Sequence, residues 1–175
     1  NIQLAHFWGE AEDAAGNKAG AHEFADGGST IGFKHEHMIS EGLTGFFKAE
    51  FEFDADDKGN ADSGLHNTDE TFIGVKGDFG SVQVGSDDTV YEQMINIVDT
   101  SEQIGLNGNF TTISEGDNAQ YMGQFDAIKV GVTYKIDGDS TTTRGTQIAV
   151  GFDADMFSVA AGYSMASDTN YGNNK

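Results

Sequence analysis

The chain has 175 residues, of which 29 are acidic and 9 are Lys or Arg, so its formal net charge is −20. This excess of negative charge argues against nucleic acid as a partner, because phosphate binding needs a basic face. The chain has no cysteine, which excludes disulfides and cysteine zinc sites, and its 24 glycines and absence of proline fit a β-protein rather than a helical one.

Apolar and polar residues alternate with a period of two from the start of the chain, which predicts β-strands. The first three predicted strands span residues 2–10, 29–38 and 43–54. Residues 11–28 consist mainly of Ala, Gly, Asp, Glu and Asn, and this composition predicts a loop.

The segment 43–54 has the clearest pattern. Phe47, Ala49, Phe51 and Phe53 share one face, and Lys48, Glu50, Glu52 and Asp54 share the other. Four charges in a row would be very costly inside a packed core, so this face needs water. The Phe row needs an apolar partner, either lipid or protein.

Residues 55–70 are predicted to form a second acidic loop, and residues 72–86 to form a hairpin. Ile73, Val75, Val82 and Val84 would share one face of this hairpin, and the turn 77–80 is bounded by glycines. An apolar outer row, a polar inner row and a very short turn are typical of a water-filled barrel in a membrane.

Residues 87–118 show little alternation, with one helical turn predicted around 90–95, and a loop of this length is usually functional. Alternation resumes near Tyr121 and continues through 128–136, 146–153 and 157–166. The pattern predicts about nine strands joined by alternately long and short connections.

No run of 18 apolar residues is present, so the sequence predicts no transmembrane helix. The mean hydropathy of −0.42 is compatible with a barrel, in which only alternate residues face lipid. Two alternatives remain open on the residues alone. One is a complete barrel of eight to ten strands with a filled interior, and the other is a soluble acidic β-sandwich or surface adhesin of a salt-adapted organism.

Three segments, in order, resemble the general porins of Gram-negative bacteria. They are Ser29-Thr-Ile-Gly-Phe-Lys-His-Glu36, Gly42-Leu-Thr-Gly-Phe-Phe-Lys-Ala-Glu-Phe-Glu-Phe53 and the hairpin Phe72–Ser86. The resemblance implies an all-β fold, a transmembrane antiparallel barrel of about 16 strands in the complete protein. The chain would be a single barrel domain over 1–175, incomplete at its C-terminus, with 87–118 folded inward as a constriction loop.

The resemblance also implies a location in the cell outer membrane and passive diffusion of small hydrophilic solutes and ions. The expected partners are two further copies in a homotrimer, together with outer-membrane lipid and lipopolysaccharide. No enzymatic activity and no cofactor are expected.

The resemblance assigns the pore lining and constriction to residues of the strands and of the presumed inward loop. They are Lys34, Glu36, Lys48, Glu50, Lys76, Ser86, Asp87, Asp88, Glu92, Asp99 and Glu102. Thr30 and Ser86 stand where the family carries wall arginines, and Arg144, placed in a loop, is the only arginine in the chain. With Lys129 as a further wall cation, the acids outnumber the wall cations, which predicts a cation-preferring channel.

Other chemistry has weak support. The acidic loop from Asp54 has Leu65 where a calcium-binding EF-hand needs Glu, so no metal site is expected there. His35 and His37 share a strand face and would need a third ligand to hold a metal. The sequence contains neither a Gly-x-Ser-x-Gly nucleophile motif nor a phosphate-binding Gly-Lys-Ser/Thr loop.

Overall fold

The structure is a computed structural model that describes residues 1–57, 64–65, 67–95, 113, 115–136 and 144–167. The described residues form ten strands and one short helix. These are β1 (Leu4–Glu12), β2 (Lys18–Asp26), β3 (Thr30–Ser40), β4 (Leu43–Glu52), β5 (Asn67–Gly77), β6 (Gly80–Ser86), α1 (Val90–Met94), β7 (Asn118–Phe125), β8 (Ile128–Lys135), β9 (Arg144–Ala154) and β10 (Phe157–Ser167). No helix in this part of the chain is long and apolar enough to cross a bilayer.

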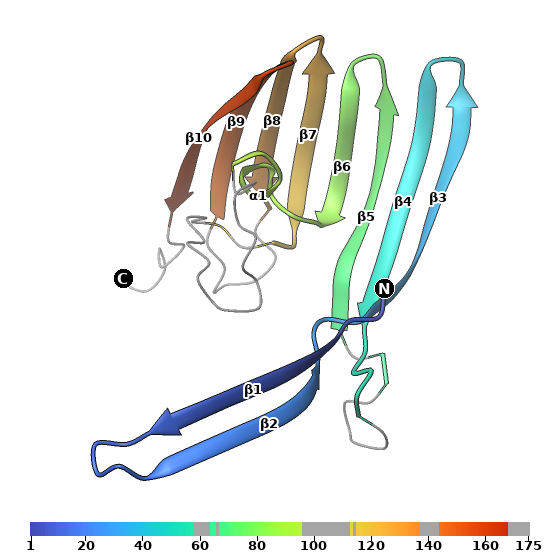
Figure 1. Cartoon of the computed structure of the whole chain (residues 1–175). Helices are drawn as coiled ribbons and strands as arrows, with labels where there is room; N and C mark the ends of the chain where they lie inside the picture. Colours follow the sequence, from blue (N-terminus) through green and yellow to red (C-terminus); the bar gives the residue numbers. More distant parts are fainter. Residues whose placement is uncertain (58–63, 66, 96–112, 114, 137–143, 168–175) are drawn as a thin grey trace, which may run out of the picture. The chain divides into compact units, whose positions relative to one another are not determined.

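The strands form two antiparallel sheets. β1 pairs with β2 alone, and β3 to β10 follow one another in chain order in a sheet of eight (Figure 1). The chain divides into two compact units, one of Asn1–Phe33 with Glu50–Asp69 and the other of Lys34–Ala49 with Glu70–Lys175. The second unit contains nearly all of the predicted pore residues.

In the first unit, β2 corrects the sequence analysis, which placed a loop over 11–28. Only residues 13–17 turn, and residue by residue β2 pairs with β1 from Leu4–Asp26 to Glu12–Lys18. Four of the nine residues of β2 are Ala or Gly, which carry almost no hydrophobic signal. The backbone ladder therefore forms where the side-chain pattern is too weak to reveal it.

In the second unit, four hairpins close with two-residue turns at one end of the sheet (Figure 1). In the predicted hairpin the turn residues are Asp78 and Phe79, and Gly77 faces Gly80 across the ladder. Gly80 has φ +100°, a conformation that glycine adopts without strain, whereas Gly77 is not among the positive-φ residues. From β3 to β10 these short turns alternate with longer connections, as expected, whereas β1–β2 and β2–β3 are both joined by short connections.

The two faces of this sheet differ as the alternation predicts. On one face the large side chains are exposed, for example Ile73 at 63%, Phe152 at 45% and Val159 at 59%. The opposite face carries Lys76, Gln83, Gln120 and Lys129, with small residues toward the C-terminal strands. Exposed apolar rows of this length are stable only against hydrocarbon or another protein surface.

The predicted helical turn is confirmed as α1, which packs on the polar face over β8, β9 and β10 (Figure 1). Val90 and Met94 are buried against Ala149, which is fully buried in β9. A Thr89–Glu92 capping box closes the start of the helix, and the backbone N–H of Val90 donates to Thr133 Oγ1 at 2.9 Å. A five-residue helix is not stable alone, so this docking is what holds it in place.

Candidate pore lining

The polar face of the second unit brings most of the predicted lining residues together. Lys34 and Glu36 lie on β3, Lys48 on β4 and Lys76 on β5, while Ser86 ends β6. Asp87 and Asp88 follow β6, and Glu92 lies within α1. Asp99 and Glu102 fall outside the described residues.

Lysines on this face pair with carboxylates on other strands. Lys76 Nζ lies 2.6 Å from Glu36 Oε1, and Lys129 Nζ lies 2.6 Å from Asp153 Oδ2. Lys48 pairs with Glu70 in the same way. Each pair joins two strands across the face and neutralises a wall cation locally.

Glu50, another predicted lining residue, belongs to the first unit. Its Oε1 accepts a hydrogen bond of 2.5 Å from the hydroxyl of Thr30, the residue that stands at the expected arginine position. The hydroxyl of Thr30, a neutral group, is thus one donor to this carboxylate.

Asp87 lies immediately after β6, outside the strands. Its carboxylate accepts a hydrogen bond from Gln83 Nε2. Burial raises the pKa of the Asp87 carboxyl to about 6, and the negative charges of Glu70 and Asp88 act in the same direction. The hydrogen bond from Gln83 opposes this shift only in part.

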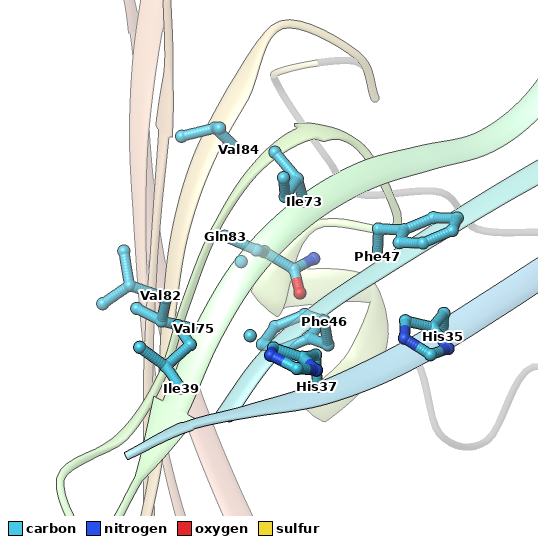
Figure 2. A pocket seen from close by; sticks show the side chains of 12 residues that line it. His35, His37, Ile39, Phe46, Phe47, Ile73, Val75, Val82, Gln83 and Val84 are labelled. Atoms are coloured by element: carbon cyan, nitrogen blue, oxygen red, sulfur yellow. The ribbon is translucent and has the colours of Figure 1, made fainter. Parts of the chain in front are cut away.

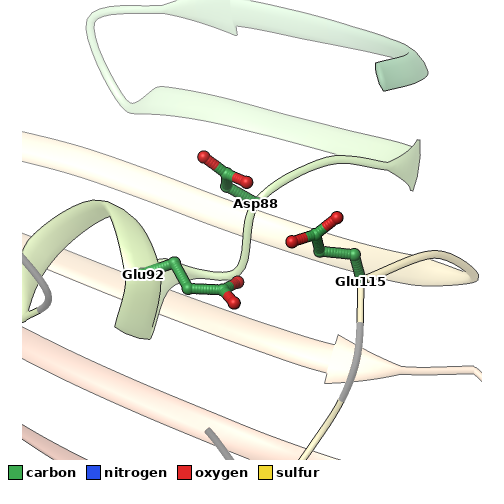
Figure 3. A group of neighbouring side chains, drawn as sticks. All are labelled: Asp88, Glu92 and Glu115. Carbon is green, nitrogen blue, oxygen red and sulfur yellow. The ribbon is translucent and has the colours of Figure 1, made fainter. Parts of the chain in front are cut away.

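Three acidic side chains lie close together beside the start of α1, namely Asp88, Glu92 and Glu115 (Figure 3). One carboxylate oxygen from each residue lies within 4.8 Å of the other two, which is close enough to share a cation. Glu92 Oε2, however, accepts hydrogen bonds from the backbone N–H and hydroxyl of Thr89, both at 2.8 Å. This oxygen thus already serves the helix cap.

His35 and His37 lie on the apolar face, where they line a groove of about 500 Å³ with Ile39, Phe47 and Ile73 (Figure 2). The His35 ring lies 6.0 Å from the ring of Phe47. Among the described residues, no third His, Cys, Asp or Glu joins the histidines to complete a metal-binding group. The groove belongs to the outward surface and not to the polar lining.

Sequence reasoning missed three carboxylates of the lining, namely Glu70, Asp153 and Glu115. The composition of residues 55–70 predicts a loop that includes Glu70, yet β5 begins at Asn67, and Glu70 and Lys76 are an even number of residues apart on that strand. This even spacing is the sequence feature that could have placed Glu70 on the same face as Lys76. Arg144 was also misplaced, since it is the first residue of β9 and not part of a loop.

Known proteins similar to this chain are porins and outer-membrane proteins. The family model of the Gram-negative porins matches residues 3–174. A monosaccharide porin of a Halomonas species and the major outer membrane protein of Halomonas elongata are each 34% identical over 93% of this chain. The chain spans about half the length of these curated relatives, 49% in each case.

Solved porin structures share the fold. Salmonella typhi OmpF, in a complex with daunomycin, superposes with a TM-score of 0.73 over 97% of this chain and 53% of its own length, at 22% identity. The anion-selective porin of Comamonas acidovorans gives a TM-score of 0.72 over 93% of this chain and 55% of its own, at 21% identity. The expected antiparallel porin β-barrel fold and outer-membrane location are thereby confirmed. The chain belongs to the Gram-negative porin family.

Proposed function

We propose that this chain forms part of a water-filled channel for passive diffusion of small hydrophilic solutes and ions across the outer membrane. The observation that carries the proposal is the contrast between the two faces of one sheet. Exposed Ile, Val and Phe side chains cover one face, and paired charges and amides cover the other. Lipid on the first face and water on the second satisfy both sets of groups.

The complete channel is proposed to contain about 16 strands and to assemble as a homotrimer. It is proposed to work without catalysis or a cofactor and to contact lipid and lipopolysaccharide. The match to half of each curated relative supports a longer protein. Heat-modifiable migration of the purified full-length protein as a trimer tests this assembly, and a monomer at all temperatures would contradict it.

The segment 87–118 is proposed to narrow the channel. Its described part supports this role, because α1 packs on the polar face and not on the apolar one. Gln93 and Gln120 both donate side-chain hydrogen bonds to the backbone oxygen of Asp88, at 2.7 and 2.6 Å. These contacts attach the start of the segment to the wall.

We propose that the channel prefers cations. Three of the four predicted wall lysines, Lys48, Lys76 and Lys129, are paired with carboxylates. Carboxylates of Asp88, Glu92 and Glu115 come together beside α1, and Asp87 precedes them in the chain. A ring of acids at a narrow point enriches cations and repels anions. The fold alone does not set this sign, since an anion-selective porin shares it.

The reversal potential of the full-length protein in a planar bilayer, measured across a KCl gradient, tests the preference. The expected sign is that of potassium permeating faster than chloride. The double variant Asp88→Asn/Glu92→Gln should move the potential toward zero, and Glu41→Gln, in a turn at the other end of the sheet, should leave it unchanged. A clear anion preference of the unmodified protein would overturn the proposal.

The requirement for detergent during purification distinguishes the soluble-protein alternative from this proposal. A β-sandwich or adhesin would purify from buffer alone, whereas the proposed channel requires detergent throughout. Extraction of the native protein from cells with and without detergent therefore decides between the two.

A further inference from the structure

β1 and β2 form a two-stranded antiparallel ribbon (Figure 1). In its register His6 lies opposite Phe24, and His22 lies opposite Trp8. The two histidines are therefore diagonal neighbours on one face of the ribbon. Their ring centroids are 5.8 Å apart, with an angle of 25° between the ring planes. The ribbon thus brings together two imidazoles that are far apart in the sequence.

This separation suits a metal ion held by both rings. Zinc binds histidine nitrogens at about 2.0–2.1 Å in line with the ring, so two imidazoles on one ion have centroids about 4.5 Å apart at a right angle and about 5.2 Å apart at the tetrahedral angle. The observed 5.8 Å is only slightly longer than the tetrahedral value. Both histidines are exposed, so their side chains can rotate toward a common ion.

Two protein ligands are enough only where water supplies the remaining ones. Among the side chains that the structure describes, no carboxylate or further histidine joins His6 and His22 in a group of three. Because both are exposed, water can complete the coordination, as it does at the open position of catalytic zinc sites. His35 and His37 differ in this respect, because they line the apolar groove that the proposed channel turns toward lipid.

The donor atoms select the class of ion. Imidazole nitrogen suits Zn²⁺, Ni²⁺ and Cu²⁺, whereas Mg²⁺ and Ca²⁺ prefer oxygen ligands. With the same ligands, Cu²⁺ binds more tightly than Ni²⁺ or Zn²⁺. The net charge of −20 also favours the approach of a cation over that of an anion.

We propose that His6 and His22 form a binding site for a divalent transition-metal ion that links β1 to β2. A two-stranded ribbon is only marginally stable by itself. An ion held by both strands stabilises their pairing, because it binds the paired state more tightly than the separated strands. The site goes beyond the proposed channel function, since neither histidine belongs to the assigned pore lining.

Trp8 supplies a local readout of binding. Its ring lies 6.4 Å from that of His22, and it is the only tryptophan of the 175 residues. Cu²⁺ quenches tryptophan emission at short range, so the full-length protein is titrated with CuCl₂ in neutral buffer with detergent. The emission that Trp8→Phe removes is the Trp8 signal, and Cu²⁺ should quench it. An excess of ZnCl₂ should restore this emission, whereas MgCl₂ should not.

The double variant His6→Asn/His22→Asn should raise the Cu²⁺ concentration for half-quenching at least about tenfold. Changes to groups that only orient a metal ligand already cost about 10–100-fold in affinity. His35→Asn/His37→Asn is the matched control, since it removes two histidines from the apolar face, and it should leave the half-quenching concentration unchanged. An unchanged concentration in the first variant, or an equal shift in the control, overturns the site.

Backbone amide exchange tests the link between the strands. Zn²⁺ at about ten times its Kd should slow the exchange of the β1 and β2 amides about tenfold in the unmodified protein and have no effect in His6→Asn/His22→Asn. Exchange that Zn²⁺ does not slow overturns the link. The KCl conductance in planar bilayers should be the same in this variant, and loss of conductance in the unmodified protein would overturn the channel and not the metal site.

Discussion

At the scale of single residues, charge pairing on the polar face shows what a sequence pattern can and cannot predict. Alternation within each strand is enough to assign Lys48 and Lys76 to the polar face. Their partners Glu70 and Glu36 depend on strand register, which no single strand reveals. The pairs could therefore not be predicted from the sequence, although the face could.

Asp87 provides a pH-dependent prediction. With a pKa of about 6, its carboxyl is ionised above that pH and neutral below it. Cation preference should therefore fall as the pH drops from about 7.5 to about 5, and Asp87→Asn should remove this step. Reversal potentials measured over the same pH range check it. Asp78→Asn, in a turn, serves as the control, and an unchanged pH profile in Asp87→Asn would contradict the assignment.

Asp87 also affects the stability of the fold. Its contribution to stability falls as the pH rises, whereas its contribution to cation preference increases. Its pKa is raised on folding, so ionisation is more costly in the folded state than in the unfolded one. Its contribution to stability is present below about pH 4, the ordinary carboxyl range, and is lost as the pH rises through about 6. Asp87→Asn should thus raise the unfolding temperature at about pH 8 and change it little at about pH 4. An equal shift at both pH values would argue against this account.

At the scale of elements, the docking of α1 explains why the C-terminal strands carry so many small residues on one face. A Cβ at Gly131 would lie 2.9 Å from Val90, and one at Gly162 would lie 2.9 Å from the Tyr91 ring. In the sequence these positions look like weak strand residues. The structure explains these glycines, because α1 occupies the space that a side chain at each position would fill.

Gly131→Val should therefore displace α1 from the sheet. Overpacking of this kind costs about 1–3 kcal/mol, and the freed segment should become sensitive to protease. Limited proteolysis and denaturant unfolding in detergent check the result. Gly9→Val is the matched control, since no atom lies within 4 Å of a Cβ placed there. Equal protease resistance in both variants would contradict the docking role.

At the scale of the whole molecule, alternation predicted the fold class and most strands. It failed at β2, where Ala and Gly hide the period, and at the beginning of β5. The constriction assigned to residues 87–118 stays a prediction. The assignment of Asp99 and Glu102 to the pore lining also stays a prediction. Asp99 and Glu102 lie outside the described part of the chain.

The assignment of the two faces predicts how charge is tolerated. Val150 lies on the apolar face near the middle of β9 and is 46% exposed. Val150→Arg should destabilise the protein in lipid by about 2–4 kcal/mol, the cost of a cation at the bilayer midplane. Ser158→Lys, on the polar face of β10 opposite Asp153, should be tolerated. Urea unfolding in lipid vesicles measures both, and the reverse ranking would mean that the faces are exchanged.

The ion pairs of the wall have one more consequence. A lysine and a carboxylate 2.6 Å apart present a short dipole, whose field decays faster than that of a single ion. The carboxylates around α1 act over a longer distance, and dissolved salt shortens the range of such charges from about 10 Å at 0.1 M to about 3 Å at 1 M. At high salt concentration such a channel would select solutes by size alone. It would distinguish cations from anions only at low salt concentration.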